Sequence, residues 1–219
     1  MADYQDIRGL RVKYLSADPS NSVGGEVWYN STTGTLKTVV STEAISSGSP
    51  LVYTTFNGGM FGTQTAAVLG GGFSPNTNPP GAGPPYDQTQ IYNGSGWSIG
   101  ANLTTGRGDE GGIGTETAGL IAGGPTGTPS ESNQTEEYDG STWTNGGDLT
   151  TGRNLVGGST AGTQTAGLIF NGWVPPTTAK TESYNGASWS EESDLNTASS
   201  YSSGAGSQTA ALNMGGNNP

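Results

Sequence analysis

The sequence predicts an all-β protein that repeats a unit of four antiparallel strands, and three observations lead to this prediction. A short pattern occurs four times, as "GTQTAAVLGGG" (62–72), "GTETAGLIAGG" (114–124), "GTQTAGLIFNG" (162–172) and "GSQTAALNMGG" (206–216). A longer stretch recurs every 46 residues, and each copy places Asn-Gly or Asp-Gly between two β-rich runs, a strong hairpin signal. No segment has the 3.6-residue apolar period of an amphipathic helix.

The period of the repeat favours a β-propeller, in which each unit forms one blade. The first strand of a unit follows an Arg, the second is the short pattern, the third ends at a Tyr and the fourth starts near a Trp. The residues that define this repeat are Tyr92, Tyr138, Tyr184, Trp97, Trp143, Trp189, Arg107 and Arg153. We expect the three Trp side chains to be buried between blades.

The two ends of the chain complement each other in this scheme. Residues 1–24 form a predicted docking arm, and residues 25–219 form the repeat domain, with a hairpin at 25–40 and repeats over 50–216. The last repeat contains only its first two strands, so the hairpin would supply the third and fourth. Four blades closed by N- and C-terminal strands would result, and the alternative is an intertwined β oligomer in which the same strands pair between chains.

The docking arm contains the apolar residues Ile7, Leu10, Val12 and Tyr14 in "IRGLRVKYL". We expect this run either to add a strand to a partner protein or to fold back on its own repeat domain.

Composition excludes several classes of function. The 219 residues include no Cys and no His, so a thiolate nucleophile, a His general base and an ordinary zinc or haem site are absent. The net charge of −11 makes nucleic acid and anionic membrane poor partners. We expect no cofactor and no metal, since Asp109-Glu110 and Glu136-Glu137 lack calcium-motif spacing. No signal peptide or 18-residue apolar run is apparent, so we expect synthesis in a cytoplasm and no membrane insertion.

Two resemblances add to this interpretation. The Gly pairs, the Tyr, the Trp five residues later and the downstream Arg resemble the Kelch repeat over about residues 62–216, although Ser199 replaces the last Arg. The N-terminal stretch "MADYQDIRGLRVKYLSADPSNSVGGEVWYNSTTGTLK" resembles the opening of virion structural proteins of marine tailed phages, especially cyanophages. Together they imply a non-enzymatic virion or tail-fibre protein that contacts other virion proteins and forms a homo-oligomer.

The loops between second and third strands differ in length and supply the candidate binding residues. Phe73, Tyr86 and Trp173 lie in them, and aromatic rings beside Asn, Thr and Asp suit a host surface glycan. The alternative is that these loops pack on a neighbouring subunit. Arg107 and Arg153 are expected to bond loop carbonyls or an acid of the adjacent blade rather than a ligand. No catalytic residue is predicted, and the rival functions are a free lectin-like propeller and a polysaccharide-degrading enzyme.

Overall fold

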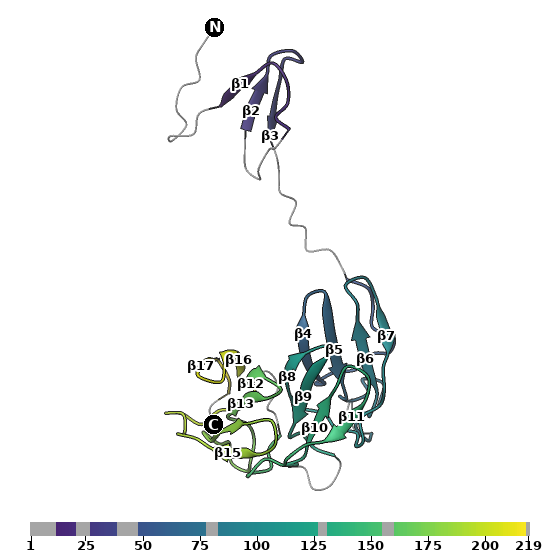
Figure 1. Cartoon of the computed structure of the whole chain (residues 1–219), viewed down its shortest axis with the longest axis vertical. Coiled ribbons are helices and arrows are strands. Elements are labelled where there is room, and N and C mark those ends of the chain that lie inside the picture. The colour runs from purple at the N-terminus through teal and green to yellow at the C-terminus, as the bar shows by residue number, and fades with distance from the viewer. Residues whose placement is uncertain are drawn as a thin grey trace. The chain divides into compact units, whose positions relative to one another are not determined.

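The computed structural model describes residues 12–20, 27–38, 48–77, 83–126, 131–154 and 160–217. Within these ranges every helix or strand element is a β-strand, which confirms the predicted all-β class (Figure 1). The chain divides into two compact units, Met1–Ser47 and Gly48–Pro219.

The N-terminal unit contains one sheet of three strands. Strands β1 (Lys13–Leu15), β2 (Val27–Asn30) and β3 (Thr35–Thr38) follow the order β1-β2-β3, with β1 parallel and β3 antiparallel to β2. Asp18 ties the sheet together, because it accepts hydrogen bonds from Trp28 Nε1 (2.9 Å), Asn30 Nδ2 (2.8 Å) and Lys37 Nζ (2.5 Å). These donors, Lys37 first, lower the pKa of Asp18 to about 2.

A hairpin therefore lies in the predicted region, but its pairing is different. Both edges of β2 are occupied, by β1 and by β3. β1, which comes from the predicted docking arm, pairs in parallel with β2. It occupies the edge of β2 with which the second strand of a blade was expected to pair. The predicted use of this hairpin as third and fourth strands is not a feature of the described sheets.

The second unit contains three sheets of four antiparallel strands and one strand pair. Sheet 1 consists of β4 (Gly59–Thr63), β5 (Ala66–Gly70), β6 (Thr89–Tyr92) and β7 (Trp97–Ile99). Sheet 2 consists of β8 (Gly111–Thr115), β9 (Ala118–Ala122), β10 (Thr135–Tyr138) and β11 (Trp143–Asn145). Sheet 3 consists of β12 (Thr160–Thr163), β13 (Ala166–Phe170), β14 (Thr181–Tyr184) and β15 (Trp189–Glu191). The C-terminal pair consists of β16 (Ser203–Ser207) and β17 (Ala210–Met214).

The repeated short pattern was predicted to form a single strand. In the structure it contains the end of one strand, a tight turn and the next strand. Thr63 pairs with Ala66 across the turn Gln64-Thr65. Gly62 has φ +112°, and a Cβ there would lie 2.3 Å from the Ala66 carbonyl oxygen. Only glycine fits where the two strands approach this closely, so the pattern begins with Gly in every copy.

The sheets pack in chain order through their first strands. β4 contacts β8, β8 contacts β12 and β12 contacts β16 (Figure 1). Between sheets 1 and 2 the buried core contains Phe61, Val68, Leu103, Ile121, Tyr138 and Trp143. Between sheets 2 and 3 it contains Ile113, Leu120, Ala122, Leu149, Ile169, Tyr184 and Trp189. Trp143 and Trp189 are thus buried as expected, whereas Trp97 is half-buried in sheet 1, the first of the series.

Candidate functional site

The chain segment that leads into sheet 2 is held by a buried ion pair. Arg107 Nη2 lies 2.7 Å from Glu136 Oε1, and both side chains are almost fully buried. Glu136 also accepts the backbone N–H groups of Thr104 (2.6 Å) and Thr105 (3.1 Å). Arg107 Nη1 donates to the Gln134 carbonyl at 2.9 Å. The carboxylate and the guanidinium together fasten this segment to the third strand of sheet 2.

The same arrangement recurs 46 residues later. Arg153 pairs with Glu182, and its Nη1 donates to the carbonyls of Asn171 (3.0 Å) and Lys180 (2.9 Å). Burial lowers the pKa of the Arg153 guanidinium, and the charge of Glu182 opposes that shift. The sequence predicts loop carbonyls or an acid of the adjacent blade as partners of these guanidinium groups. The carbonyls are present, and the acids are Glu136 and Glu182 of the same sheets into which the arginine segments lead. These arginines position loops and are not presented to a ligand.

Sheet 1 has a neutral version of this fastening. Gln90 stands where Glu136 and Glu182 stand, and its Oε1 accepts the N–H groups of Val52 (2.7 Å) and Tyr53 (3.3 Å). The segment that leads into sheet 1 is therefore held in the same way as the later two, without a charge.

Two of the three predicted binding aromatics lie together on the loop after β5, and each packs on another ring. Phe73 forms an antiparallel bridge with Phe56, with ring centroids 5.7 Å apart. Tyr86 meets Tyr53 edge to face at 6.1 Å. Burial raises the pKa of Tyr53 to about 12. All four aromatic residues are half-buried.

Trp173 is on the corresponding loop of sheet 3 and has different neighbours. Its backbone forms bridges with Asn154 and Thr177, and its N–H donates to the Asn154 carbonyl at 2.7 Å. The side chain is half-buried. Trp173 and Phe73 each follow the glycine-containing end of a second strand, so they occupy matching positions on different sheets.

The acidic residues considered as calcium ligands have partners within the chain. Glu136 is ion-paired, Glu137 accepts the Tyr184 hydroxyl at 2.5 Å and Asp109 accepts Asn57 Nδ2 at 2.6 Å. Glu110 is fully buried and accepts the Gly59 N–H at 2.9 Å. In the described part of the chain, no group of three or more acidic residues is placed to hold a metal ion.

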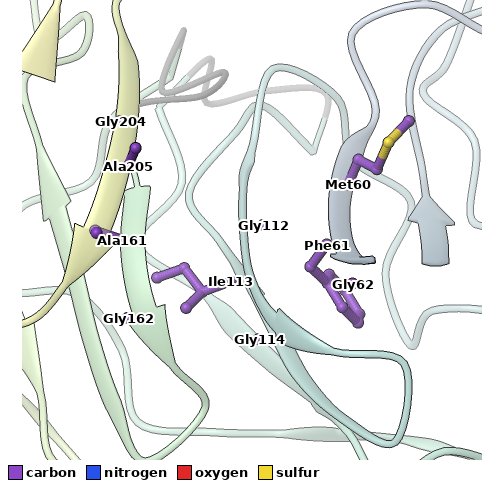
Figure 2. Close-up of a pocket in the computed structure, with 11 residues that line it drawn as sticks. Met60, Phe61, Gly62, Gly112, Ile113, Gly114, Ala161, Gly162, Gly204 and Ala205 are labelled. Atoms are coloured by element: carbon purple, nitrogen blue, oxygen red, sulfur yellow. The ribbon is translucent and has the colours of Figure 1, made fainter. Parts of the chain in front are cut away.

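A pocket of about 310 Å³ lies among the first strands of the successive sheets (Figure 2). It is lined by Met60, Phe61, Gly62, Gly112, Ile113, Gly114, Ala161, Gly162, Gly204, Ala205 and Gly206. Phe61 and Ile113 also belong to the buried cores between sheets. The lining contains backbone and apolar side chains, so it offers no acid, base or nucleophile for chemistry.

The structure describes two of the four predicted docking residues. Val12 and Tyr14 are exposed, and the Tyr14 ring stacks on Tyr29 with centroids 4.9 Å apart. Ile7 and Leu10 lie outside the described residues.

Two contacts between neighbouring sheets were not predicted from the sequence. The indole N–H of Trp143 donates to Thr89 Oγ1 of the preceding sheet at 3.0 Å, and that of Trp189 donates to Thr135 Oγ1 at 2.9 Å. The sequence feature that could have indicated these acceptors is a Thr that stands three residues before each repeat Tyr.

The second contact comes from the glutamine in the tight turn. Gln164 Nε2 donates to the carbonyls of Gly119 (2.8 Å) and Tyr138 (2.9 Å) in the preceding sheet. Gln208 makes the matching bonds to Gly167 (3.0 Å) and Tyr184 (2.8 Å). Sheets 2 and 3 are thus each held by hydrogen bonds from the turn that follows them in the chain.

No protein-family model matches the chain, and no curated protein is significantly similar to it. Among the described residues, no helix is long and apolar enough to cross a membrane.

Proposed function

We propose that this chain is a non-enzymatic structural protein of a phage virion, either tail-fibre-like or decorating the particle. Its repeat domain is a Kelch-like propeller of four blades, closed by strands from the two ends of the chain, and the protein forms a homo-oligomer with other virion proteins as partners. The intertwined β oligomer is the alternative form of closure.

The observation that carries this proposal is that buried ion pairs, or a buried glutamine in sheet 1, hold the segment leading into each four-stranded sheet, while the loops differ in length. Arg107–Glu136, Arg153–Glu182 and the neutral Gln90 each fix a loop segment to its sheet. A scaffold built this way serves rigidity rather than chemistry, because its buried charges are used internally. The resemblance of the N-terminal stretch to phage virion proteins supports the proposed location in a virion.

Mass spectrometry of purified particles tests the location. We expect this chain at a constant ratio to the major capsid or tail proteins. A free lectin-like propeller or a secreted polysaccharide-degrading enzyme would be depleted from washed particles, and that result would refute the proposal.

The loop surface is proposed to contact a host surface glycan. Phe73 with Phe56 and Tyr86 with Tyr53 give two ring pairs against which a sugar face could stack. Tyr86→Ala and Trp173→Ala should weaken adsorption of particles to host cells by tenfold or more while assembly stays normal, because few aromatic anchors dominate such interfaces. Normal adsorption with failed assembly would assign these loops to contacts between subunits.

A further inference from the structure

The sheet of the N-terminal unit has one covered face and one open face. Along β2 the residues Trp28 and Asn30 are buried, at 6% and 4% exposure, and Asp18 accepts a hydrogen bond from each of them. Val27 and Tyr29 alternate with these two residues and are only half-buried. Because successive side chains of a strand point to opposite faces, Val27 and Tyr29 belong to the open face.

The open face is apolar and receives side chains from all three strands. Tyr14 of β1 pairs with Tyr29 of β2, and Tyr29 pairs with Leu36 of β3, so these residues form one row across the sheet. The Tyr14 ring stacks on Tyr29 with centroids 4.9 Å apart. Tyr14 is 71% exposed and Leu36 is 66% exposed. We call this surface, which consists of Val12, Tyr14, Val27, Tyr29 and Leu36, the Tyr14 face.

Such a surface is unusual for a sheet that faces water. An antiparallel pair with one face in the core normally places polar side chains on the other face. The Tyr14 face instead presents two aromatic and three aliphatic residues, and none of them is charged. A contiguous exposed apolar surface of this kind indicates contact with another protein chain.

The size of the unit is a second reason to expect a partner. The N-terminal unit spans Met1–Ser47. Units shorter than about 70–80 residues rarely bury enough apolar surface to be stable alone, and many depend on disulfides or on oligomerisation. The chain has no Cys, so a disulfide is not available to this unit. Oligomerisation through the Tyr14 face would supply the missing burial.

The distribution of charge favours a second copy of the same unit as that partner. Residues 1–47 contain five acids and four bases, a net charge of −1, whereas residues 48–219 contain thirteen acids and three bases, a net charge of −10. Two copies of the N-terminal unit can therefore approach each other with little repulsion, while two repeat domains repel each other. A strongly basic or acidic partner would find no complementary charge on the Tyr14 face.

We propose that the N-terminal unit joins copies of this chain, with the Tyr14 faces of two copies packed against each other. Both copies supply the same residues, as a two-fold contact requires. Packing of one sheet face on the other buries Tyr14 and Leu36 of both copies in a shared apolar layer. This inference rests on the homo-oligomer of the proposed function and names its contact surface.

Analytical ultracentrifugation of the full-length chain over the micromolar range tests the contact. The wild type should form a dimer whose fraction rises with concentration. Tyr14→Ser with Leu36→Ser should raise the dimer dissociation constant by about a hundredfold or more, because two large apolar side chains leave the contact in each copy. Ile99→Ser is the matched control and should leave the dissociation constant unchanged, since Ile99 is 62% exposed but lies on β7 of the second unit.

A second variant and a folding measurement keep the test decisive. Leu36→Lys keeps both Tyr rings and brings like charges together at the contact, so it should also dissociate the dimer. The indole N–H of Trp28 donates to Asp18 on the covered face, and its NMR resonance should keep its position in the variants. Dissociation with an unchanged Trp28 resonance supports the Tyr14 face. A dimer that withstands Leu36→Lys would overturn the proposal.

Salt gives an independent measurement. Raising the sodium chloride concentration from about 50 to about 500 mM should tighten the dimer several-fold, because it screens the repulsion between the two acidic repeat domains and leaves an apolar contact in place. Weaker association at high salt would overturn the proposal, because it would show that the contact is ionic.

Failure of this inference can be told apart from failure of the proposed function. A wild-type chain that sediments as a monomer would overturn both the contact and the homo-oligomer. A wild-type dimer that dissociates with Ile99→Ser, but not with Leu36→Lys, would overturn the contact alone and leave the homo-oligomer standing. The mass spectrometry of particles decides the virion location independently of either result.

Discussion

Glu110 shows how a single residue makes the fold sensitive to pH. One carboxylate oxygen accepts the Gly59 N–H, while the other is buried without a partner. Burial is the main cause that raises the pKa of Glu110 from 4.5 to about 8. The folded chain therefore keeps a proton that the unfolded chain releases, and folding is linked to pH through this one group.

The free energy of unfolding should fall as the pH rises from about 4.5 to about 8 and level off above that window, because the raised pKa favours the protonated folded state. Glu110→Gln should remove most of this decline and should be more stable than the wild type at pH 9. Melting temperatures at pH 5, 7 and 9 would measure it, with the exposed Asp148→Asn as control. A wild type with the same pH profile as Glu110→Gln would show that Glu110 does not hold the proton.

Arg153 and Glu182 form a buried ion pair, and replacing only one of the two residues should destabilise the protein more than replacing both. Arg153→Thr leaves a buried carboxylate with only backbone donors, such as the Thr150 N–H, and should cost about 3–5 kcal/mol of unfolding free energy. The double variant Arg153→Thr/Glu182→Gln copies the neutral arrangement of sheet 1 and should recover much of that loss. Urea denaturation of the single and double variants would measure the coupling. Additive losses would mean that the two side chains act independently.

At the scale of elements, the tight turns between the first and second strands carry a glutamine at the same position, except in sheet 2. Gln164 and Gln208 donate to the preceding sheet, but the turn of sheet 2 has Glu116 in that position. A carboxylate has no N–H group to donate to the backbone carbonyls of sheet 1. This turn is therefore the weakest fastening of the series.

Glu116→Gln should stabilise the protein by about 1 kcal/mol, since it supplies one donor group to two carbonyls of sheet 1. Gln164→Glu should destabilise it by a similar or larger amount. Thermal melts of both variants at pH 7 would check the opposite signs. If both variants shifted stability in the same direction, the residue at this turn position would not stabilise the protein through hydrogen bonds to the carbonyls of the preceding sheet.

The aromatic contacts between sheets belong to the same scale. Trp143→Ala should cost about 3–5 kcal/mol, because it removes a buried ring from the core of sheets 1 and 2. Trp143→Phe should cost less, since it keeps the packing and loses only the bond to Thr89. Chemical denaturation would rank the three proteins. A silent Trp143→Ala variant would refute the packing of these sheets on one another.

The strands and turns of the repeats could be predicted because their signals are local. Asn93 and Asp139 mark hairpins through bonds to N–H groups two and three residues ahead, and those bonds are present. Pairings between distant segments carry no such signal. The parallel pairing of β1 with β2 depends on contacts outside any repeat, and so does the pairing of Phe73 with Phe56.

In the candidate binding loops, too, the local features could be predicted from the sequence and the contacts with distant segments could not. The unequal loops could be recognised by comparing repeat lengths, and the Tyr86 N–H does bond the carbonyl of Gly72, the residue before Phe73. Their ring partners Phe56 and Tyr53 come from the segment before the first full repeat, where no second copy allowed comparison. The burial of Glu110 was also hidden, because Asp109-Glu110 reads as an ordinary polar turn.

For the whole molecule, truncation should separate the two units. Removing residues 1–20 should leave a folded repeat domain. Removing residues 1–47 should leave the edge of β17 without the N-terminal strands that the proposed function assigns to it, so the fragment should melt at lower temperature and aggregate. Light scattering during heating would compare the truncated chains with the full-length protein. A fragment 48–219 that melts cooperatively at the full-length temperature would contradict the closure.

The glutamine fastenings all point in one direction along the chain, and this has a consequence for synthesis. Sheet 2 or sheet 3, when it has just left the ribosome, lacks its glutamine hydrogen bonds until the turn that follows it has been synthesised. A messenger RNA truncated near its 3′ end would therefore yield chains that melt from their C-terminal side, even though every sheet within them is complete.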